Sequence, residues 1–415
     1  MWTFLYFVLL PTILIFGLPI YFYRGVISQL RKILRPDLDK LVNTRSSVLA
    51  REDWTKNPQW NLVIWLTHEG LLDFEKFRKD FYNDYVMQED DNGNLKFPEY
   101  QQHYYKWMGF LFWRWEDVFD MREHVRTYDG DHQASVVDKS RFLQIVKELT
   151  WKPWQARKSP WEFLQVAHYD DGSGDGVEKS QFIFRIHHGL GDGYYILKLL
   201  AEDICGVSTA LGKPQVIPRN FFQNIFLGFL FWIRAPFQMV QMLVAAHDVN
   251  EWHLPLDKVT RPMNIALTEP IKLDWIKSIK NEYCVSFSAV IYAAVTGGIR
   301  NLMIEKGVPV PNEMHTAVAV PVPGHPPKLR NHFIFAFIEL PIGISDPVER
   351  LQKMEINYIN LKRSAAPKAS FAKVPLVGAL PPWMMSPGCV NRLSTCLVSN
   401  FPGSPQLYFK GIRVS

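Results

Sequence analysis

The residues best suited to chemistry lie together in one short segment, HHGLGDG, which runs from His187 to Gly193. Histidine is the side chain whose ordinary pKa suits proton transfer near neutral pH, so His188 or its neighbour could act as a general base. Asp192 could fold back toward the histidines or pair with a distant arginine. The three glycines allow positive φ or a close approach of the backbone, as a buried active-site turn requires.

A strand and a helix are expected to hold this segment in place. Residues 181–186 (QFIFRI) form an apolar, alternating run that predicts a strand, and residues 194–200 (YYILKLL) predict the first turns of a helix. Adjacent strand residues point to opposite faces and no further ligand cluster lies nearby, which disfavours a metal site. A dinucleotide site is also disfavoured, because Tyr194 stands where the third glycine of the fingerprint belongs.

The HHxxxDG pattern resembles the signature of the CoA-dependent acyltransferase superfamily. Peptide-synthetase condensation domains share this form with the wax ester synthase/diacylglycerol acyltransferase (WS/DGAT) family. Further segments resemble the WS/DGAT family and keep its order along the chain. They are residues 61–66, 71–78, 115–125, 153–162 (PWQARKSPWE), 339–351 and 399–411. This shared order favours the WS/DGAT family over a condensation domain.

The chain departs from the family pattern at a few positions. Phe287 and Ser288 replace the Asn-Asp pair that opens a helix in the family, and Gln155 replaces the aspartate of its PLD pattern. Family members usually continue beyond the position of Ser415 through further strands and a helix. The resemblance therefore implies a shortened C-terminal half, with lower stability or activity than a full-length relative.

The resemblance implies an α/β fold with two chloramphenicol-acetyltransferase-like subdomains around a central tunnel, preceded by an N-terminal transmembrane helix. We expect five regions along the chain. They are a membrane anchor (1–23), a linker (24–57), an N-terminal acyltransferase half (58–215), a connector (216–257) and a C-terminal half (258–415). The apolar part of the connector, residues 221–244, fits either an amphipathic segment on the membrane or a core helix between the halves.

Composition agrees with a folded, lipid-handling protein. Hydrophobic residues make up 47% of the 415 residues and charged residues 21%, which excludes a largely disordered chain. The net charge of +5 suits an anionic membrane surface or the phosphates of coenzyme A. Nothing in the chain resembles a nucleic-acid-binding module. The four cysteines form no CxxC pair, so neither a zinc site nor a disulfide framework is expected.

The N-terminus predicts a single-pass membrane anchor. Residues 1–23 carry no charge and match the roughly 20 residues that a helix needs to cross a bilayer. Arg24, Arg31, Lys32 and Arg35 follow, which places the catalytic part on the cytoplasmic side. Endoplasmic reticulum, lipid droplet and plasma membrane all fit such an anchor. A buried helix of a soluble protein is the alternative.

The resemblance also implies a mechanism and its substrates. His188 would act as the general base on the hydroxyl of a fatty alcohol or diacylglycerol, which attacks an acyl-CoA thioester. Acyl-CoA is then a co-substrate, and neither a further cofactor nor a metal is expected. His187 would point away and shape the turn, and Asp192 would hold the loop through an ion pair. Gly193 would let the backbone pass the acyl-CoA closely.

Three further residues are candidates for substrate binding. Ser399 and Asn400 could steady the oxyanion or the thioester, and Trp161 belongs to the PWQARKSPWE segment. Two other functions remain open. One is a lipid-binding or scaffolding relative that has lost activity. The other is a condensation domain, which would need carrier domains that this chain does not contain.

Residues 170–176 (DDGSGDG) mimic a calcium-binding loop. If Asp171 begins that loop, Phe182 stands where its bidentate glutamate should be. The segment is therefore predicted to be a hairpin turn that leads into the strand before the histidines.

Overall fold

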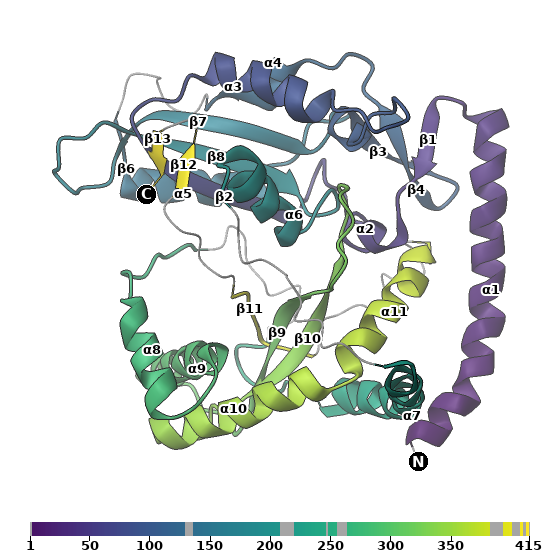
Figure 1. Cartoon of the computed structure of the whole chain (residues 1–415), viewed down its shortest axis with the longest axis vertical. Helices are drawn as coiled ribbons and strands as arrows, with labels where there is room; N and C mark the ends of the chain where they lie inside the picture. Colours follow the sequence, from purple (N-terminus) through teal and green to yellow (C-terminus); the bar gives the residue numbers. More distant parts are fainter. Residues whose placement is uncertain are drawn as a thin grey trace.

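The computed structural model describes residues 2–128, 136–207, 220–245, 248–254, 264–381, 393–400, 407–409 and 412–414. The described chain forms two lobes, and each lobe holds a β-sheet with helices packed against it (Figure 1). In this view the first lobe lies above the second, and the long helix α1 runs along one side. This is the α/β architecture of two subdomains that the sequence predicted.

The main sheet of the first lobe carries the histidine segment. Its strands run in the order β12-β13-β2-β8-β7-β5, and β6 pairs with β7. Strand β8 lies between β2 and β7, pairs antiparallel with both, and is buried along its whole length. The strands are β2 (Asn61–Glu69), β5 (Val125–Thr127), β6 (Val137–Asp138), β7 (Trp161–Asp170), β8 (Lys179–His187), β12 (Leu407–Phe409) and β13 (Ile412–Val414).

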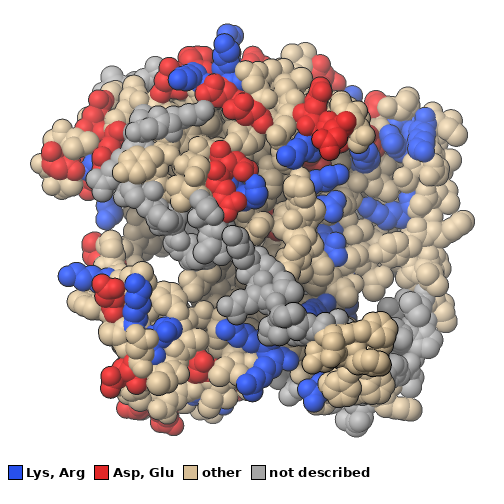
Figure 2. All heavy atoms as spheres, in the orientation of Figure 1, with Lys and Arg blue, Asp and Glu red and all other residues tan. Residues whose placement is uncertain are grey.

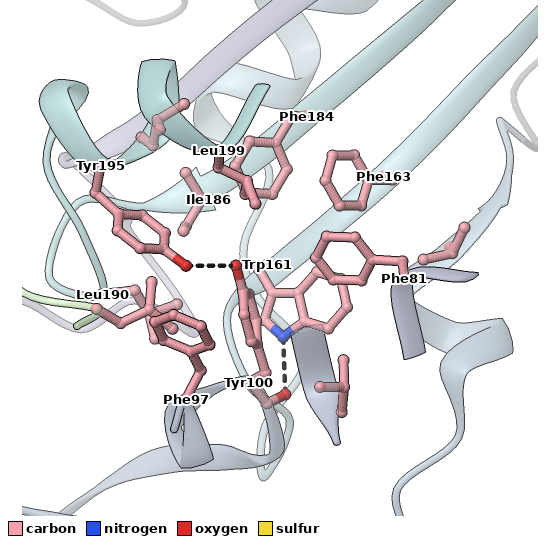
Figure 3. Packing of buried hydrophobic residues seen from close by; sticks show 14 of the residues in the cluster. Phe81, Phe97, Tyr100, Trp161, Phe163, Phe184, Ile186, Leu190, Tyr195 and Leu199 are labelled. Atoms are coloured by element: carbon pink, nitrogen blue, oxygen red, sulfur yellow. Dashed lines mark hydrogen bonds between the residues drawn. The ribbon is translucent and has the colours of Figure 1, made fainter. Parts of the chain in front are cut away.

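Helices cover both faces of this sheet. On one face, Phe184 and Ile186 of β8 enter an aromatic cluster with Phe81 of the helix above (Figure 3). On the other face, Ile183 packs against Phe142. Burial of each such side chain contributes about 1.5–3 kcal/mol, so the strand is held firmly from both sides. The helical elements are α3 (Phe74–Phe81), η1 (Tyr82–Val86), η2 (Pro98–Gln101), α4 (Met121–His124) and α5 (Lys139–Trp151).

The segment predicted to be a linker, residues 24–57, is structured. Helix α1 does not end near residue 23 but continues to Leu34, and Ile27 and Leu38 pack against Phe112 of a small second sheet. The apolar residues after the uncharged stretch explain the difference, because they give this segment its own buried face. Its elements are α1 (Trp2–Leu34), β1 (Leu38–Leu41) and α2 (Thr44–Leu49), and β1 pairs with β4 (Phe110–Trp115), which pairs with β3 (Gln102–Trp107).

The second lobe contains a three-stranded sheet in the order β10-β9-β11. Helix α9 is the one helix among the described residues that is long and apolar enough to span a membrane. Its residues Ala289, Val290 and Tyr292 are nevertheless buried in the core of this lobe. Its elements are α8 (Leu273–Glu282), α9 (Phe287–Glu305), β9 (Met314–Pro321), β10 (Phe333–Leu340), α10 (Pro347–Arg363), α11 (Ala366–Ala379) and β11 (Cys396–Val398).

The end of the chain crosses from the second lobe to the first. Strands β12 and β13 pair with each other, and Val414 of β13 pairs with His68 of β2. The predicted C-terminal half, residues 258–415, is therefore not one unit in space. Hydrophobic pattern along the chain cannot reveal which sheet a short terminal strand joins. Residues 401–406, which hold the rest of the SNFPG segment, lie outside the described residues.

Two helical elements, α6 (Gly193–Leu197) and η3 (Lys198–Ile204), follow the histidine segment. Helix α7 (Phe221–Ala245) lies in the predicted connector. Helix α7 is continuous through Arg234 and Pro236. It packs beside α1 and α11 at one end of the molecule (Figure 1). Parts of the predicted connector, residues 216–219, 246–247 and 255–257, lie outside the described residues.

The loop of residues 170–176 is a turn between β7 and β8, as predicted. The ammonium group of Lys179 donates to the carboxylates of Asp171 and Asp175, both at 2.7 Å, and to the hydroxyl of Ser173 at 2.9 Å. The ammonium group of Lys179 thus binds the carboxylates that a calcium ion in this loop would require.

Gly378 lies where α11 touches α2, and we expect its replacement by alanine to destabilise the protein. A Cβ atom at this position would lie 1.7 Å from the carbonyl oxygen of Thr44. Overpacking of this kind costs about 1–3 kcal/mol. Gly298 is a matched control, because nothing lies within 4 Å of its Cβ position in α9 and alanine favours helices. Urea unfolding should show a lower midpoint for Gly378→Ala only; equal midpoints for both variants would contradict the prediction.

Candidate active site

His188 lies just beyond β8, and backbone and ring contacts fix its position. Its amide donates to the carbonyl oxygen of Trp60 at 2.7 Å. Its imidazole stacks on Phe333 with ring centroids 5.2 Å apart, and the indole of Trp60 meets it edge-on at 6.3 Å. Trp60 comes from the first lobe and Phe333 from β10 of the second. The imidazole is therefore held between the lobes.

Asn331 of the second lobe determines which nitrogen of His188 carries the proton. Its side-chain amide nitrogen donates to the carbonyl oxygen of His188 at 2.7 Å and to the hydroxyl of Ser46 at 3.2 Å. Its side-chain oxygen then lies 2.9 Å from Nδ1 of His188 and must accept a proton from it. With Nδ1 protonated, Nε2 carries the lone pair. Nε2 is thus the ring nitrogen that is free to accept a proton.

Burial lowers the pKa of His188 below its ordinary value of 6.5. Only the neutral imidazole can accept a proton, so any activity that depends on it should be complete at neutral pH. We expect kcat/KM to fall only when the pH drops through this lowered pKa. A pH profile of kcat/KM would test this, and an acidic limb centred above 6.5 would contradict it.

His187 is not at the cavity, and its side chain bonds to residues of the first lobe. It is completely buried, and its Nε2 lies 3.0 Å from a carboxylate oxygen of Glu52. Its Nδ1 accepts a hydrogen bond from the amide of Gly189 at 3.1 Å. Glu52 also accepts from the backbone amides of Gln59 and Trp60. Together these bonds join the turn after β8 to the segment before β2.

Asp192 joins the turn to the second lobe, but its charged partner is a histidine and not an arginine. One carboxylate oxygen caps α6 by accepting from the amide of Tyr195 at 3.0 Å, and the other accepts from the amide of His332 at 2.7 Å. Nε2 of His325 lies 3.2 Å from the first oxygen. Burial alone would raise the pKa of Asp192, but His325 outweighs it and lowers that pKa. Burial would lower the pKa of His325, and Asp192 raises it instead.

The glycines of the turn serve close packing. None of the three has a positive φ, so that part of the expectation is wrong. At Gly189, a Cβ atom would lie 2.6 Å from the Tyr104 hydroxyl and 2.8 Å from Cβ of Ala50. Glycine is therefore required there because the segment around α2 presses against the backbone of the turn.

A cavity of about 370 Å³ lies between the lobes and contains the exposed edge of His188. Most of its walls are apolar, including Phe333, Phe335 and Leu397. The predicted site residues His188, Asp192, Gly193, Ser399 and Asn400 all line it. Residues more than 200 positions apart in the sequence thus meet at one cavity of a size that suits a small-molecule ligand.

Trp161, predicted to bind substrate, does not line this cavity, so the structure does not bring it together with His188. Its ring is buried in the aromatic cluster of the first lobe, and its indole nitrogen donates to the carbonyl oxygen of Tyr100 at 2.8 Å (Figure 3). The neighbouring Glu162 forms ion pairs with Arg185 at 2.8 Å and Arg126 at 3.0 Å. The PWQARKSPWE segment therefore supports β8 and does not contact the cavity around His188.

Four residues of this arrangement were not found by sequence reasoning. They are Ser46, Glu52, His325 and Asn331. Ser46 and Glu52 lie in the segment expected to be a linker, and the other two lie in the loop between β9 and β10. No local pattern marks them, because their partners are distant in sequence. Among the described residues, no group of three or more His, Cys, Asp or Glu side chains could hold a metal ion.

Comparison with known proteins gives matches along most of the chain. Residues 329–415 match the WS/DGAT C-terminal domain family. Two curated sequences from strains of Mycobacterium tuberculosis, each provisionally named a diacylglycerol O-acyltransferase, are 23% identical over 341 residues. These alignments cover 73% of this chain and 65% of each relative, so the match spans less than two thirds of the relatives' length.

Solved structures share the fold. The wax ester synthase/diacylglycerol acyltransferase from Marinobacter aquaeolei VT8 matches with a TM-score of 0.55 and 14% identity, covering 90% of this chain and 85% of that one. A starter condensation domain of rhizomide synthetase, solved in complex with C8-CoA, matches with a TM-score of 0.50 and 11% identity, covering 94% and 84%. The resemblance to the WS/DGAT family and to condensation domains, predicted from the sequence, is confirmed.

Proposed function

We propose that this chain, which carries a WS/DGAT C-terminal domain, transfers a fatty acyl group from acyl-CoA to a hydroxyl group. The acceptor is a long-chain alcohol or diacylglycerol, and the product is a wax ester or triacylglycerol. One observation carries the proposal. A histidine of the HHxxxDG segment, with Nε2 set up as a base, lines an apolar cavity between two lobes.

The reaction follows from the orientation of His188. Nε2 takes the proton from the acceptor hydroxyl while that oxygen attacks the thioester carbonyl carbon. The tetrahedral intermediate breaks its carbon–sulfur bond, and the leaving thiolate takes the proton back from the imidazolium. A base in this position contributes about 10²–10⁴-fold to the rate. No covalent acyl-enzyme is required.

The negative charge of the intermediate needs a partner. Ser399 and Asn400 line the same cavity as His188 and carry side chains that can donate hydrogen bonds. We assign them to the oxyanion or the thioester. Gly193 lines the cavity without a side chain, which leaves room for the acyl-CoA close to the backbone.

The apolar helices at one end of the molecule support association with a lipid surface. On α7, Phe222 is 78% exposed and Phe229 is 62% exposed, and on the adjacent α1, Phe22 is 76% exposed. The surface over the lower right of Figure 2, where α7 lies, is free of charge over most of its visible described area. We assign the N-terminal part of α1 to a membrane anchor with the catalytic lobes on the cytoplasmic side. Substrates dissolved in the membrane would then lie near the protein.

The test is an acceptor assay with membranes that contain the full chain. Labelled palmitoyl-CoA is supplied with hexadecanol or with diacylglycerol, and the neutral lipids are separated. Labelled wax ester or triacylglycerol would support the proposal and identify the acceptor. Folded protein that gives neither product would overturn it.

A lipid-binding relative without activity is the second candidate, and the replacement of the family Asn-Asp pair by Phe287 and Ser288 favours it. In the acceptor assay, bound palmitoyl-CoA without product would identify this second function.

A further inference from the structure

A second cavity lies directly beside the one that contains His188. Its volume is about 580 Å³, and polar and charged residues such as Asn83, Asp84, Lys96 and Lys198 line much of it. Asn83 and Asp84 are exposed at the surface, so water reaches this polar cavity. The cavity of His188 is largely apolar, and the two differ sharply in the environment they offer.

Tyr194 separates the two cavities. Among the described residues, Tyr194 is the one that lines both cavities. Beside it, Asp192 lines the apolar cavity and its ion-pair partner His325 lines the polar one. Tyr194 and the Asp192–His325 ion pair therefore lie at the boundary between the two cavities.

The ring of Tyr194 is supported from behind. It stacks on the imidazole of His325 with centroids 4.9 Å apart and planes 25° apart. Nδ1 of His325 forms a hydrogen bond with the carbonyl oxygen of Pro326 at 2.8 Å, and Nε2 lies at ion-pair distance, 3.2 Å, from Asp192. The Asp192 carboxylate also accepts from the amide of His332, which fixes it to the second lobe. These contacts limit the freedom of the ring to turn aside.

We infer that Tyr194 is a water seal, and that it determines whether the acyl group goes to an alcohol or to water. The inference rests on the proposed function. Any base that activates an alcohol hydroxyl at a thioester can also activate water. Exclusion of water is one way in which a closed site prevents such hydrolysis.

The competing reaction is simple. A water oxygen attacks the thioester carbonyl carbon while Nε2 of His188 takes one of its protons. The carbon–sulfur bond breaks, the thiolate takes that proton from the imidazolium, and the products are free fatty acid and coenzyme A. In the native protein, the ring of Tyr194 keeps water of the polar cavity away from this position.

The experiment compares Tyr194→Ala with Tyr194→Phe in the full chain. With labelled palmitoyl-CoA and hexadecanol, the ratio of free palmitate to hexadecyl palmitate is measured. A small change in apolar contacts typically alters an enzyme's discrimination between two substrates by about 10–200-fold. We therefore expect the ratio of palmitate to hexadecyl palmitate to rise by about tenfold in Tyr194→Ala. Tyr194→Phe keeps the ring and should keep the wild-type ratio. An unchanged ratio in Tyr194→Ala would overturn the inference.

A second measurement does not depend on acyl transfer. A dansyl-labelled fatty acid bound in the apolar cavity reports the polarity around it through its emission. We expect a red shift in Tyr194→Ala and none in Tyr194→Phe; equal emission in both would count against a seal. If the wild type transfers acyl groups to no acceptor, the proposed function fails, and the emission alone decides about the seal. Tyr194→Leu, which also lacks the ring, replaces the alanine variant if that protein does not fold.

Discussion

Replacement of His188 by alanine is expected to lower kcat/KM for acyl transfer by about 10²–10⁴-fold, the usual contribution of a positioned base. The side chain lines the cavity and carries the lone pair on Nε2, so its loss leaves no base at this position. The binding of palmitoyl-CoA should change little, because the remaining walls of the cavity are kept. Kinetics with hexadecanol and a separate binding measurement would distinguish the two effects.

A matched control exists elsewhere in the same sheet. His168 is an exposed histidine of β7 whose Nδ1 lies 3.3 Å from the exposed Glu178. His168→Ala should keep the wild-type kcat/KM. If His188→Ala keeps it as well, His188 is not the base, and the mechanism is wrong.

Replacement of Asn331 should have the second largest effect, although this residue reaches the reacting atoms only through His188. Loss of the partner that sets a histidine tautomer costs about 10⁴-fold in a serine protease. The partner here is a neutral amide, so we expect a smaller loss in kcat for Asn331→Leu, about 10²-fold. KM for palmitoyl-CoA should change little. Asn331 is thus a positioning residue, and its contribution should appear in kcat.

The variant Asn331→Asp separates orientation from simple packing. A carboxylate can also accept the proton on Nδ1, so part of the activity should return relative to Asn331→Leu. Its negative charge favours the imidazolium, so the pKa of His188 should rise. The acidic limb of the kcat/KM profile should then move to higher pH. A profile with an unmoved limb, or no recovery in Asn331→Asp, would assign Asn331 a role in packing only.

Much of the local structure around His188 could be predicted from the sequence. The apolar run before the histidines and the helical pattern after them gave β8 and α6. These predictions rest on periodicity, which local sequence contains.

The contacts that complete the site could not be predicted in this way. Asn331 and His188 are 143 residues apart, and Asn331 and Ser46 are 285 residues apart. An asparagine, a serine or a glutamate in a loop carries no periodic signal, and its role follows only from the side chain it meets. The same reason explains why the partner of Asp192 was expected to be an arginine. Its actual partner, His325, lies in a loop near Pro326 and Pro327 without a recognisable motif.

Trp161 is a different case. It belongs to a segment that resembles a family pattern, and this suggested a role in substrate binding. Its position in β7 directs the ring into the aromatic cluster beside Phe81 and Tyr100. A residue can therefore belong to a characteristic pattern because it supports the strand that leads to His188.

Direct transfer from acyl-CoA to the acceptor is the central claim, and intact-protein mass spectrometry with product analysis tests it most directly. The protein is mixed with palmitoyl-CoA, first alone and then with hexadecanol. We predict hexadecyl palmitate as the product while the mass of the protein stays unchanged at every time point. A mass increase of one palmitoyl group that disappears when hexadecanol is added would contradict the claim, because the acyl group would then pass through the protein itself.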